Sequence, residues 1–326
     1  MKHISILVPR GAILGSLEGS RQLFTQVNLF CAARGEAPMF EVQLVGLERE
    51  TRLNGGFFTV HSTALLHEVD KTDLIIIPAV DGDLPQAIED NRDFLPWITE
   101  RYRGGSEVAS LCLGAFLLAS TGLLNGRKSA THWMAHDHFR RMFPEVELVT
   151  EKIITDEQGF YSSGGAFSYL NLLLHLIEKY AGRDMAILSA KVFAIEIERE
   201  NQLSFAIFRG QREHGDESVL KAQVFIEQHF RERISVDQLA DILALGRRSL
   251  ERRFKKATGN TVSEYIQRVK MEAAKKAFET GRKNINEIMY EVGYSDNKAF
   301  RTVFRKVTGL SPVEYRNKYN KESILI

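Results

Sequence analysis

A cysteine and a histidine lie twenty positions apart and could form the nucleophilic pair of a cysteine enzyme. Cys112 ends an apolar run and precedes a glycine and a helical pattern, in the segment VASLCLGAFLLASTGLLNG (108–126). A thiol at such a strand-to-helix turn lies at the helix N-terminus, where the helix dipole lowers its pKa and favours the thiolate. His132, in SATHW (129–133), could act as base or ion-pair partner for attack on a carbonyl. Two other roles stay open: Cys112 could line a ligand pocket or only pack at a tight turn, and His132 could only hydrogen-bond within its loop.

Further polar groups could surround a small ligand near this cysteine. The loop YSSGGAF (161–167) combines Tyr and Ser donors with Gly164 and Gly165 at an expected helix N-terminus, where backbone N–H groups suit a carboxylate. An ordinary strand-to-helix turn explains this loop equally well. Trp133 could offer its ring face to a cationic ligand, or it could belong to the core. The candidates for a ligand pocket are Ser16, Cys112, Leu113, His132, Trp133, Ser163, Gly164 and Gly165.

Other patterns exclude classes of site and location. His136, Asp137 and His138 can ligate metals, but adjacent positions on a helix diverge, so we expect no metal site. The segment VDGD (80–83) lacks phosphate-loop spacing and is expected to be a turn. The two cysteines give no disulfide framework, and no apolar run reaches the ~20 residues of a membrane span. These features favour a cytoplasmic protein with free thiols and no membrane contact.

Basic side chains gather in the last third of the chain. Residues 218–326 contain 22 Lys and Arg against 13 Asp and Glu, whereas residues 1–217 contain 21 against 29. A basic module attracts the phosphate backbone of a nucleic acid, and an acidic neighbour does not. Residues 218–326 therefore either bind a nucleic acid or carry a basic but inert surface.

The same region contains an internal repeat. Segments 235–267 and 284–316 each have a short helix, a turn, a basic helix and a Thr-Gly pair followed by Glu-Tyr. We expect one offset of 50 residues to relate the two copies throughout, which indicates duplication. The matched pairs are Leu239 with Met289, Leu250 with Phe300, Phe254 with Phe304, Thr258-Gly259 with Thr308-Gly309, and Tyr265 with Tyr315.

Each copy has the residue pattern of a helix-turn-helix unit. Gly246 and Gly293 lie near the expected turns, where a compact chain reversal favours glycine. Apolar residues four positions apart form the buried face of each second helix, so its polar residues are exposed and can contact bases and phosphates in a major groove. The middle helix 262–281 would hold the two units for successive major grooves about 10 bp apart. The DNA-binding candidates are Arg247, Arg248, Glu251, Arg252, Lys255, Asn297, Lys298, Arg301, Thr302 and Arg305.

This region resembles the DNA-binding domain of the AraC/XylS-type regulators. The resemblance is carried by GYSDNKAFRTVFRKVTGLSPVEYR (293–316), with its glycine-aromatic-Ser-Asp turn, paired phenylalanines and Ser-Pro before the last tyrosine. It implies an all-α domain with two helix-turn-helix units that bind double-stranded DNA. Carried over by position, the base- or phosphate-facing residues are Arg248, Glu251 and Arg252 in the first unit and Asn297, Lys298, Arg301 and Thr302 in the second.

Strand-like and helix-like segments alternate over the first 200 residues. The run DLIIIPA (73–79) is apolar throughout, which is typical of a strand buried on both faces. The alternation predicts a doubly wound α/β domain with a mostly parallel sheet, and ligands of such sheets bind beyond the C-terminal strand ends. Cys112 and the loop after Ile77 fall at that edge. The expected strands include 3–9, 41–48, 73–79 and 107–112, and the expected helices 20–35, 84–105, 114–124, 166–182 and 184–205.

The segment ASLCLGAFLLASTGLLNGRKSATHW (109–133), together with the buried strand, resembles the PfpI-like branch of the class I glutamine amidotransferase-like superfamily. It is especially similar to the version fused ahead of AraC-type domains, where this domain is thought to sense small molecules. Enzymatic relatives place an acidic residue after the first strand, but here Ser16 takes that position and Glu18 is out of register. Asn171 stands where relatives often have an aspartate. Without an acidic neighbour the cysteine lacks the group that tunes its protonation, which argues against hydrolase activity.

Together these features predict a ligand-responsive transcriptional regulator rather than an enzyme, with no cofactor. Residues 1–205 would sense a small metabolite, nitrogenous by resemblance, and dimerise; residues 206–217 would be a linker; residues 218–326 would bind promoter DNA. RNA polymerase is a further expected partner. Two alternatives stay open: a cysteine-dependent hydrolase or lyase that uses Cys112 and His132 and carries a DNA-binding domain, and a constitutive architectural DNA binder.

Overall fold

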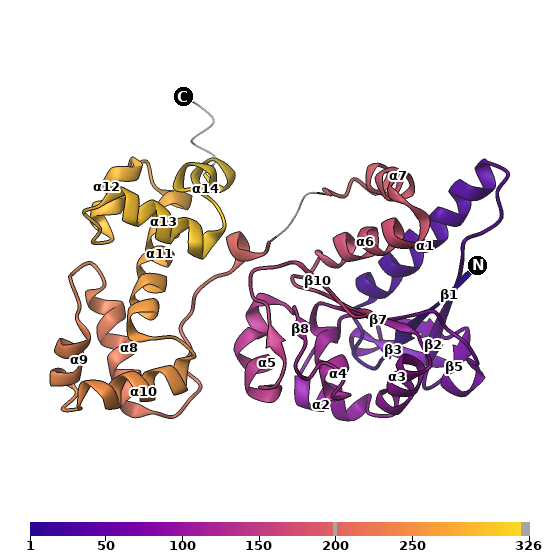
Figure 1. Cartoon of the computed structure of the whole chain (residues 1–326), viewed down its shortest axis with the longest axis horizontal. Helices are drawn as coiled ribbons and strands as arrows, with labels where there is room; N and C mark the ends of the chain where they lie inside the picture. The colour runs from indigo at the N-terminus through magenta and orange to yellow at the C-terminus, as the bar shows by residue number, and fades with distance from the viewer. Residues whose placement is uncertain (198–200, 321–326) are drawn as a thin grey trace. The chain divides into compact units, whose positions relative to one another are not determined.

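The chain forms two compact units, Met1–Gln202 and Leu203–Ile326. Its structure is a computed structural model that describes residues 1–197 and 201–320 (Figure 1). The division lies just before the expected linker, residues 206–217, and part of that segment packs within the second unit. Phe208 contacts a hydrophobic core there, and Asp216 caps the helix that begins at Glu217. No helix among the described residues is long and apolar enough to cross a membrane.

A seven-stranded sheet forms the centre of the first unit, with the strand order β10-β11-β7-β6-β1-β2-β5. Neighbouring strands are parallel except β10 and β11, which confirms the predicted mostly parallel sheet. Two short pairs lie outside it, β3 with β4 and β8 with β9. The strands are β1 (Lys2–Val8), β2 (Phe40–Gly46), β3 (Glu50–Leu53), β4 (Phe58–His61), β5 (Ala64–Leu65), β6 (Leu74–Ile77), β7 (Glu107–Leu111), β8 (Lys128–Ser129), β9 (Glu147–Leu148), β10 (Ile154–Glu157) and β11 (Phe160–Ser163).

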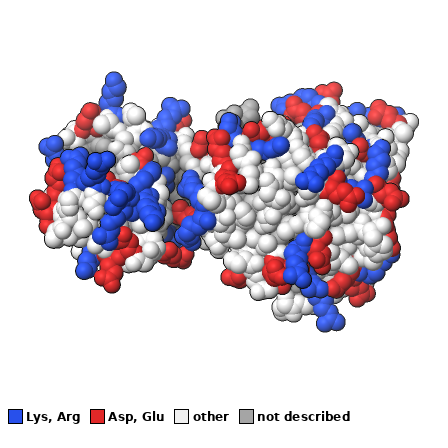
Figure 2. All heavy atoms as spheres, turned by 60° about the horizontal axis from the view of Figure 1, so that its bottom comes forward, with Lys and Arg blue, Asp and Glu red and all other residues white. Residues whose placement is uncertain are grey.

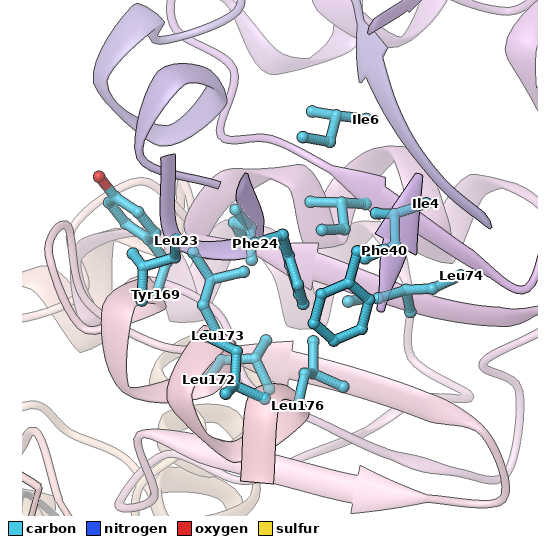
Figure 3. Packing of buried hydrophobic residues seen from close by; sticks show 14 of the residues in the cluster. Ile4, Ile6, Leu23, Phe24, Phe40, Leu74, Tyr169, Leu172, Leu173 and Leu176 are labelled. Atoms are coloured by element: carbon cyan, nitrogen blue, oxygen red, sulfur yellow. The ribbon is translucent and has the colours of Figure 1, made fainter. Parts of the chain in front are cut away.

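Helices cover both faces of this sheet, as a doubly wound fold requires. Ile4 and Ile6 of β1 point into one core and Leu7 into the other, because alternate residues of a strand face opposite sides. Figure 3 shows the first core, where the rings of Phe24 and Phe40 meet edge to face at 5.0 Å. The helices on this face are α1 (Leu14–Ala33), α6 (Tyr169–Ala181) and α7 (Arg183–Phe193), and those on the other are α2 (Leu84–Asp90), α3 (Phe94–Arg103), α4 (Ala115–Ser120) and α5 (His136–Met142).

One expected helix, 84–105, is two helices, and the break has a tertiary cause. Asn91 is buried between α2 and α3. Its carboxamide accepts a hydrogen bond from Arg10 N at 2.8 Å and donates to Arg10 O at 3.0 Å. The side chain thus fixes the loop after β1, and the helix is interrupted where that contact is made.

Two other expected helices are shorter than their apolar patterns suggest. The pattern 114–124 yields α4, which ends at Ser120, and a 3-10 turn over Cys112–Gly114 precedes it. The pattern 184–205 yields α7, which ends at Phe193 before a left-handed Ala194. Residues 198–200 of that range lie outside the described residues. The remaining 3-10 turns are Asn54–Gly56, Leu66–Glu68, Trp133–Ala135 and Leu203–Phe205.

The second unit is all-α and has two hydrophobic cores, as the repeat predicts. Leu250 and Phe254 are fully buried in one core, and Phe300 and Phe304 in the other. The long helix α11 contributes residues to both cores and so joins them. The helices are α8 (Glu217–His229), α9 (Val236–Ile242), α10 (Arg247–Thr258), α11 (Val262–Thr280), α12 (Ile285–Glu291), α13 (Asn297–Thr308) and α14 (Pro312–Tyr319).

The expected uniform offset of 50 residues is wrong for the first helix of each repeat. The bounds of α10 and α13 differ by 50, but those of α9 and α12 differ by 49, as do their N-caps Ser235 and Asn284. Leu239 therefore corresponds to Ile288, not to Met289, and all three are buried. The connection 292–296 is one residue longer than 243–246, and its last residue, Asp296, caps α13 at the position that Gly246 takes before α10.

The two glycines of these turns do not have equivalent roles. Gly293 has a φ of 74°, the left-handed conformation that favours glycine. Gly246 is the N-cap of α10 and has a φ of −68°. The left-handed residue of the first turn is Ala244, with a φ of 49°. The prediction that Gly246 supplies the chain reversal is therefore wrong.

Candidate ligand site and nucleic-acid interface

Cys112 lies at the carboxyl end of β7, at the edge where the sheet was expected to bind a ligand. Its φ of 53° is unusual for a residue with a side chain and makes the turn sharp. Its backbone nitrogen donates to Ser163 Oγ at 3.3 Å, and its carbonyl oxygen accepts from Thr131 Oγ1 at 2.9 Å. Three loops that are distant in sequence therefore meet at this cysteine.

The thiol of Cys112 does not have the ionisation of an activated nucleophile. The side chain is only 3% exposed, and this burial raises its pKa from 9.0 to about 11, outweighing a hydrogen bond from the Leu113 backbone that lowers it. The thiol is therefore neutral near pH 7. The predicted thiolate is wrong because loss of solvation outweighs the dipole of a helix as short as α4.

His132 is turned to its own loop rather than to the cysteine. Its Nδ1 accepts a hydrogen bond from Met134 N at 3.2 Å, so the ring caps the 3-10 turn that follows. Burial lowers the pKa of His132, which favours the neutral ring. Within the described residues no hydrogen bond joins His132 to Cys112, so the hypothetical nucleophile–base pair is not assembled.

The residues at the two acidic positions of enzymatic relatives have structural contacts here. Ser16 Oγ donates to Ile13 O at 2.8 Å and accepts from Ala79 N at 3.0 Å, which ties the start of α1 to the segment after β6. Asn171 Nδ2 donates to Glu196 O at 2.6 Å. Glu18 forms an ion pair with Arg21 at 2.7 Å. None of these groups is placed to tune the protonation of Cys112.

The glycine loop before α6 is less open to a carboxylate than we expected. The backbone nitrogen of Gly164 already donates to Ile153 O at 2.7 Å, so that donor is not available. Gly165 has a φ of 87°. The hydroxyl of Ser168 is buried beside Gly165 and has no hydrogen-bond partner among the described residues.

Gln202 belongs to this site and was missed by the sequence analysis. Its side chain is 1% exposed, and its Nε2 donates to Thr131 O at 3.2 Å and to Lys152 O at 3.4 Å. The carboxamide covers Gly164 so closely that any Cβ there would collide with it. The glutamine lies 38 residues after Gly164, within the expected helix 184–205, and that helical pattern marks none of its residues as part of a ligand site.

The remaining ligand candidates are less enclosed. Leu113 and Trp133 are half-buried, and the rings of His132 and Trp133 lie 5.5 Å apart. Trp133 is therefore not part of the core. The described residues contain no group of three or more His, Cys, Asp or Glu side chains that could hold a metal ion.

The DNA-binding candidates lie on the outer faces of α10 and α13. All ten are exposed except Asn297, which is half-buried. Figure 2 shows Lys and Arg side chains crowded on the displayed face of this unit, at the left. Lys256 and Lys306 are also exposed in the last turns of the two helices. These two lysines were not among the residues predicted from the sequence, although the offset between the repeats relates one to the other.

The cations of these helices differ in their partners. Within the described residues, the guanidinium groups of Arg248 and Arg252 and the ammonium group of Lys298 have no protein partner. Arg247 Nη1 binds Asp237 Oδ2 at 2.9 Å, and Lys255 Nζ donates to Gly259 O at 2.7 Å. Free cations suit phosphate or base contacts, whereas paired ones first have to break a contact or share it.

Comparison with known proteins identifies both units. A DJ-1/PfpI family model matches residues 29–179, and a helix-turn-helix domain model matches residues 239–318. The HTH-type transcriptional regulator ArgR of Pseudomonas aeruginosa is 27% identical over 217 residues, which are 66% of this chain and 66% of that protein. The HTH-type transcriptional regulator CdhR of the same species is 23% identical over 317 residues, 95% of this chain and 90% of its own length.

A solved structure supports the fold of the first unit. The crystal structure of a Vibrio parahaemolyticus protein matches with a TM-score of 0.53 and 26% identity, over 59% of this chain and 98% of that one. The part of ArgR that aligns with this chain is just under two thirds of the length of ArgR. The named relatives are regulators of transcription, which favours the regulatory interpretation over the hydrolase alternative. Residues 29–179 therefore match the DJ-1/PfpI family and residues 239–318 a helix-turn-helix domain, and the chain is similar to AraC-type transcriptional regulators.

Proposed function

We propose that α10 and α13 enter two successive major grooves of promoter DNA while the Met1–Gln202 unit senses a small molecule. The observation that carries the DNA-binding part is the pair of repeated helices, each with exposed cations on its outer face. Phosphate contacts from such cations supply affinity, and base contacts from the same faces supply specificity.

The length of α11 supports contact with successive grooves. This helix has 19 residues, or about 28 Å at 1.5 Å per residue, close to the roughly 34 Å of one turn of DNA. Its buried Lys270 donates to Glu232 O at 3.4 Å, in the connection between α8 and α9, and to Gly293 O at 3.1 Å, in the turn of the second repeat. The ammonium group therefore links the segment just before the first repeat to the second repeat.

The ligand-sensing part rests on the edge of the sheet around Cys112. A neutral thiol, the hydroxyl of Ser168 and the half-buried ring of Trp133 lie on the loops at this edge. Such groups suit a small metabolite with hydrogen-bonding and cationic nitrogen groups. Ser16, Leu113, His132, Ser163, Gly164 and Gly165 complete the proposed pocket.

Ligand binding would shift the equilibrium between conformations that differ in DNA binding. The size of this shift is limited by the difference in the ligand's affinity for those conformations. We further propose that the chain acts as a cytoplasmic homodimer and contacts RNA polymerase at its promoters. These partners follow from the regulatory role and are separate from the DNA contact itself.

The test uses the full-length protein and sheared genomic DNA. Fragments that co-purify with the protein are sequenced, and their affinity is measured by gel shift at physiological salt. We expect a sequence-preferring fragment set, and a metabolite that stabilises the protein in a thermal-shift screen should change the affinity for it. Binding that is equal for all sequences would contradict regulation, and stabilising metabolites without effect on DNA affinity would contradict sensing.

A further inference from the structure

We propose that the two helix-turn-helix units read different bases at one equivalent position: Arg301 reads a guanine and Glu251 reads a cytosine. This inference rests on the proposed major-groove binding and adds its specificity. Glu251 and Arg301 are the fifth residues of α10 and α13 and lie 50 residues apart. Both are exposed on the outer face of their helix.

Arg301 is held by two neighbouring amides. Its Nε donates to Asn297 Oδ1 at 2.5 Å, and Asn297 Nδ2 donates in turn to Asn286 Oδ1 of α12 at 2.8 Å. Its two terminal nitrogens make no protein contact within the described residues. A guanidinium held at Nε presents its two terminal N–H groups as a fork, which matches O6 and N7 of guanine.

Glu251 is held by Arg247, which is itself paired with an aspartate of α9. Arg247 Nε donates to Glu251 Oε1 at 3.4 Å, and Arg247 Nη1 binds Asp237 of α9 at 2.9 Å. A carboxylate at this position is repelled by phosphate, so a DNA contact there has to be to a base. The base edge that offers a donor to a carboxylate in the major groove is N4 of cytosine.

The residues that hold Arg301 and those that hold Glu251 occupy equivalent positions in the two repeats. Asp237 and Asn286 are the second residues of α9 and α12, and Arg247 and Asn297 are the first residues of α10 and α13. The duplicated scaffold is therefore kept, while the side chain at the base-reading position has changed from acidic to basic. The DNA site of one protomer should consist of two unlike subsites, not of a direct repeat.

The experiment selects binding sequences from a randomised duplex library with full-length wild type, Arg301→Gln and Glu251→Gln. Glutamine prefers adenine, so Arg301→Gln should replace one guanine by adenine in one subsite and leave the other unchanged. Glu251→Gln should replace a cytosine by adenine in the other subsite. On the wild-type sequence Arg301→Gln should lose roughly 5- to 150-fold in affinity, the range for one bidentate base contact.

Two further variants separate base reading from charge and from folding. Lys306→Gln removes the same charge from the last turn of α13 and should weaken binding to all sequences without changing the selected bases. Asn286→Ala should relax the preference for the guanine read by Arg301, and Asn286→Asp should restore it because a carboxylate also accepts from Asn297.

The outcomes distinguish this inference from the function on which it rests. If wild type selects no sequence, the proposed DNA recognition fails. If wild type selects a site but Arg301→Gln and Glu251→Gln select the same bases, or lose affinity uniformly, the base assignment is overturned.

Discussion

Ser163 Oγ accepts a hydrogen bond from Cys112 N at 3.3 Å and so joins the ends of the neighbouring parallel strands β7 and β11. The sharp turn that presents a nucleophile in an enzyme is present, but the thiol at its apex is buried and neutral. The geometry therefore suits a residue that lines a binding site rather than one that attacks a substrate.

The ionisation of Cys112 predicts a loss of stability at high pH. The unfolded chain ionises this thiol near 9.0 and the folded chain near 11, so the stabilising contribution of the neutral thiol is complete below pH 9.0 and declines as pH rises above it. The free energy of unfolding should fall with pH by up to about 1.4 kcal/mol per unit more steeply in wild type than in Cys112→Ala. Denaturant titrations between pH 8 and 11 measure it. Parallel curves for the two proteins would show that the thiol ionises normally in the fold.

The buried aromatic pair of the second repeat predicts a large effect of truncation. The ring of Phe304 lies 5.5 Å from Phe278 and 5.4 Å from Tyr315, and its side chain is fully buried. Phe304→Ala should cost about 3–5 kcal/mol of unfolding free energy, because it leaves a cavity in the core. Equilibrium denaturation followed by circular dichroism measures the loss. The matched control is Tyr290→Ala, an exposed aromatic of the same unit, which should melt like wild type; equal stability of the Phe304 variant would contradict the assigned buried face.

Two adjacent arginines of α10 predict opposite phenotypes. Arg252 is exposed and has no partner within the described residues, whereas Arg253 binds both oxygens of Asp216, at 2.8 and 2.6 Å. Arg252→Ala should lower DNA affinity about tenfold without changing the melting temperature. If the lost contact is to phosphate, the salt dependence of the affinity should also become shallower, with a slope smaller by about 1. Arg253→Ala should lower the melting temperature and leave the affinity of the folded protein unchanged. The reverse assignment of phenotypes would place the wrong face of α10 against DNA.

A variant of Lys270 should fold but should bind DNA that contains two subsites less tightly. Burial lowers its pKa, and its ammonium group bridges a carbonyl of the α8–α9 connection and one of the second repeat. Lys270→Met keeps the length of the side chain and relieves the burial of a charge, so stability should change by less than about 1 kcal/mol. The link from the segment just before the first repeat to the second repeat is lost, and affinity for two-subsite DNA should fall roughly tenfold while affinity for a single subsite is kept. Anisotropy titrations with the two duplexes compare these values, and equal losses on both would refute a linking role.

The sequence was sufficient for the fold and the repeat where one local signal decided the structure. The run Leu74–Ile77 could only be a strand buried on both faces, and the spacing of Leu250 and Phe254 could only place both on one helical face. Charge and duplication then predicted the DNA-binding faces of α10 and α13. These signals are short-range, so one sequence contains them completely.

The parts that the sequence could not predict depend on contacts between distant segments. Asn91 breaks a helix because of Arg10, and Gln202 closes the edge around Thr131 from the far end of the unit. The extra residue in the turn before α13 could not be recognised from the sequence, because two repeats stay similar when one of them has a residue inserted in a turn. The pKa of Cys112 is set by how deeply the fold buries it, which neighbouring residues do not reveal.

The most direct test of the central claim is methylation interference on a selected promoter fragment. Guanine N7 lies in the major groove, so methylation there blocks a helix that enters it. The full-length protein should be blocked by methylation in two clusters about 10 bp apart on one face of the duplex. Interference in a single cluster, or none at all on a fragment that is bound, would contradict an account in which α10 and α13 both read DNA.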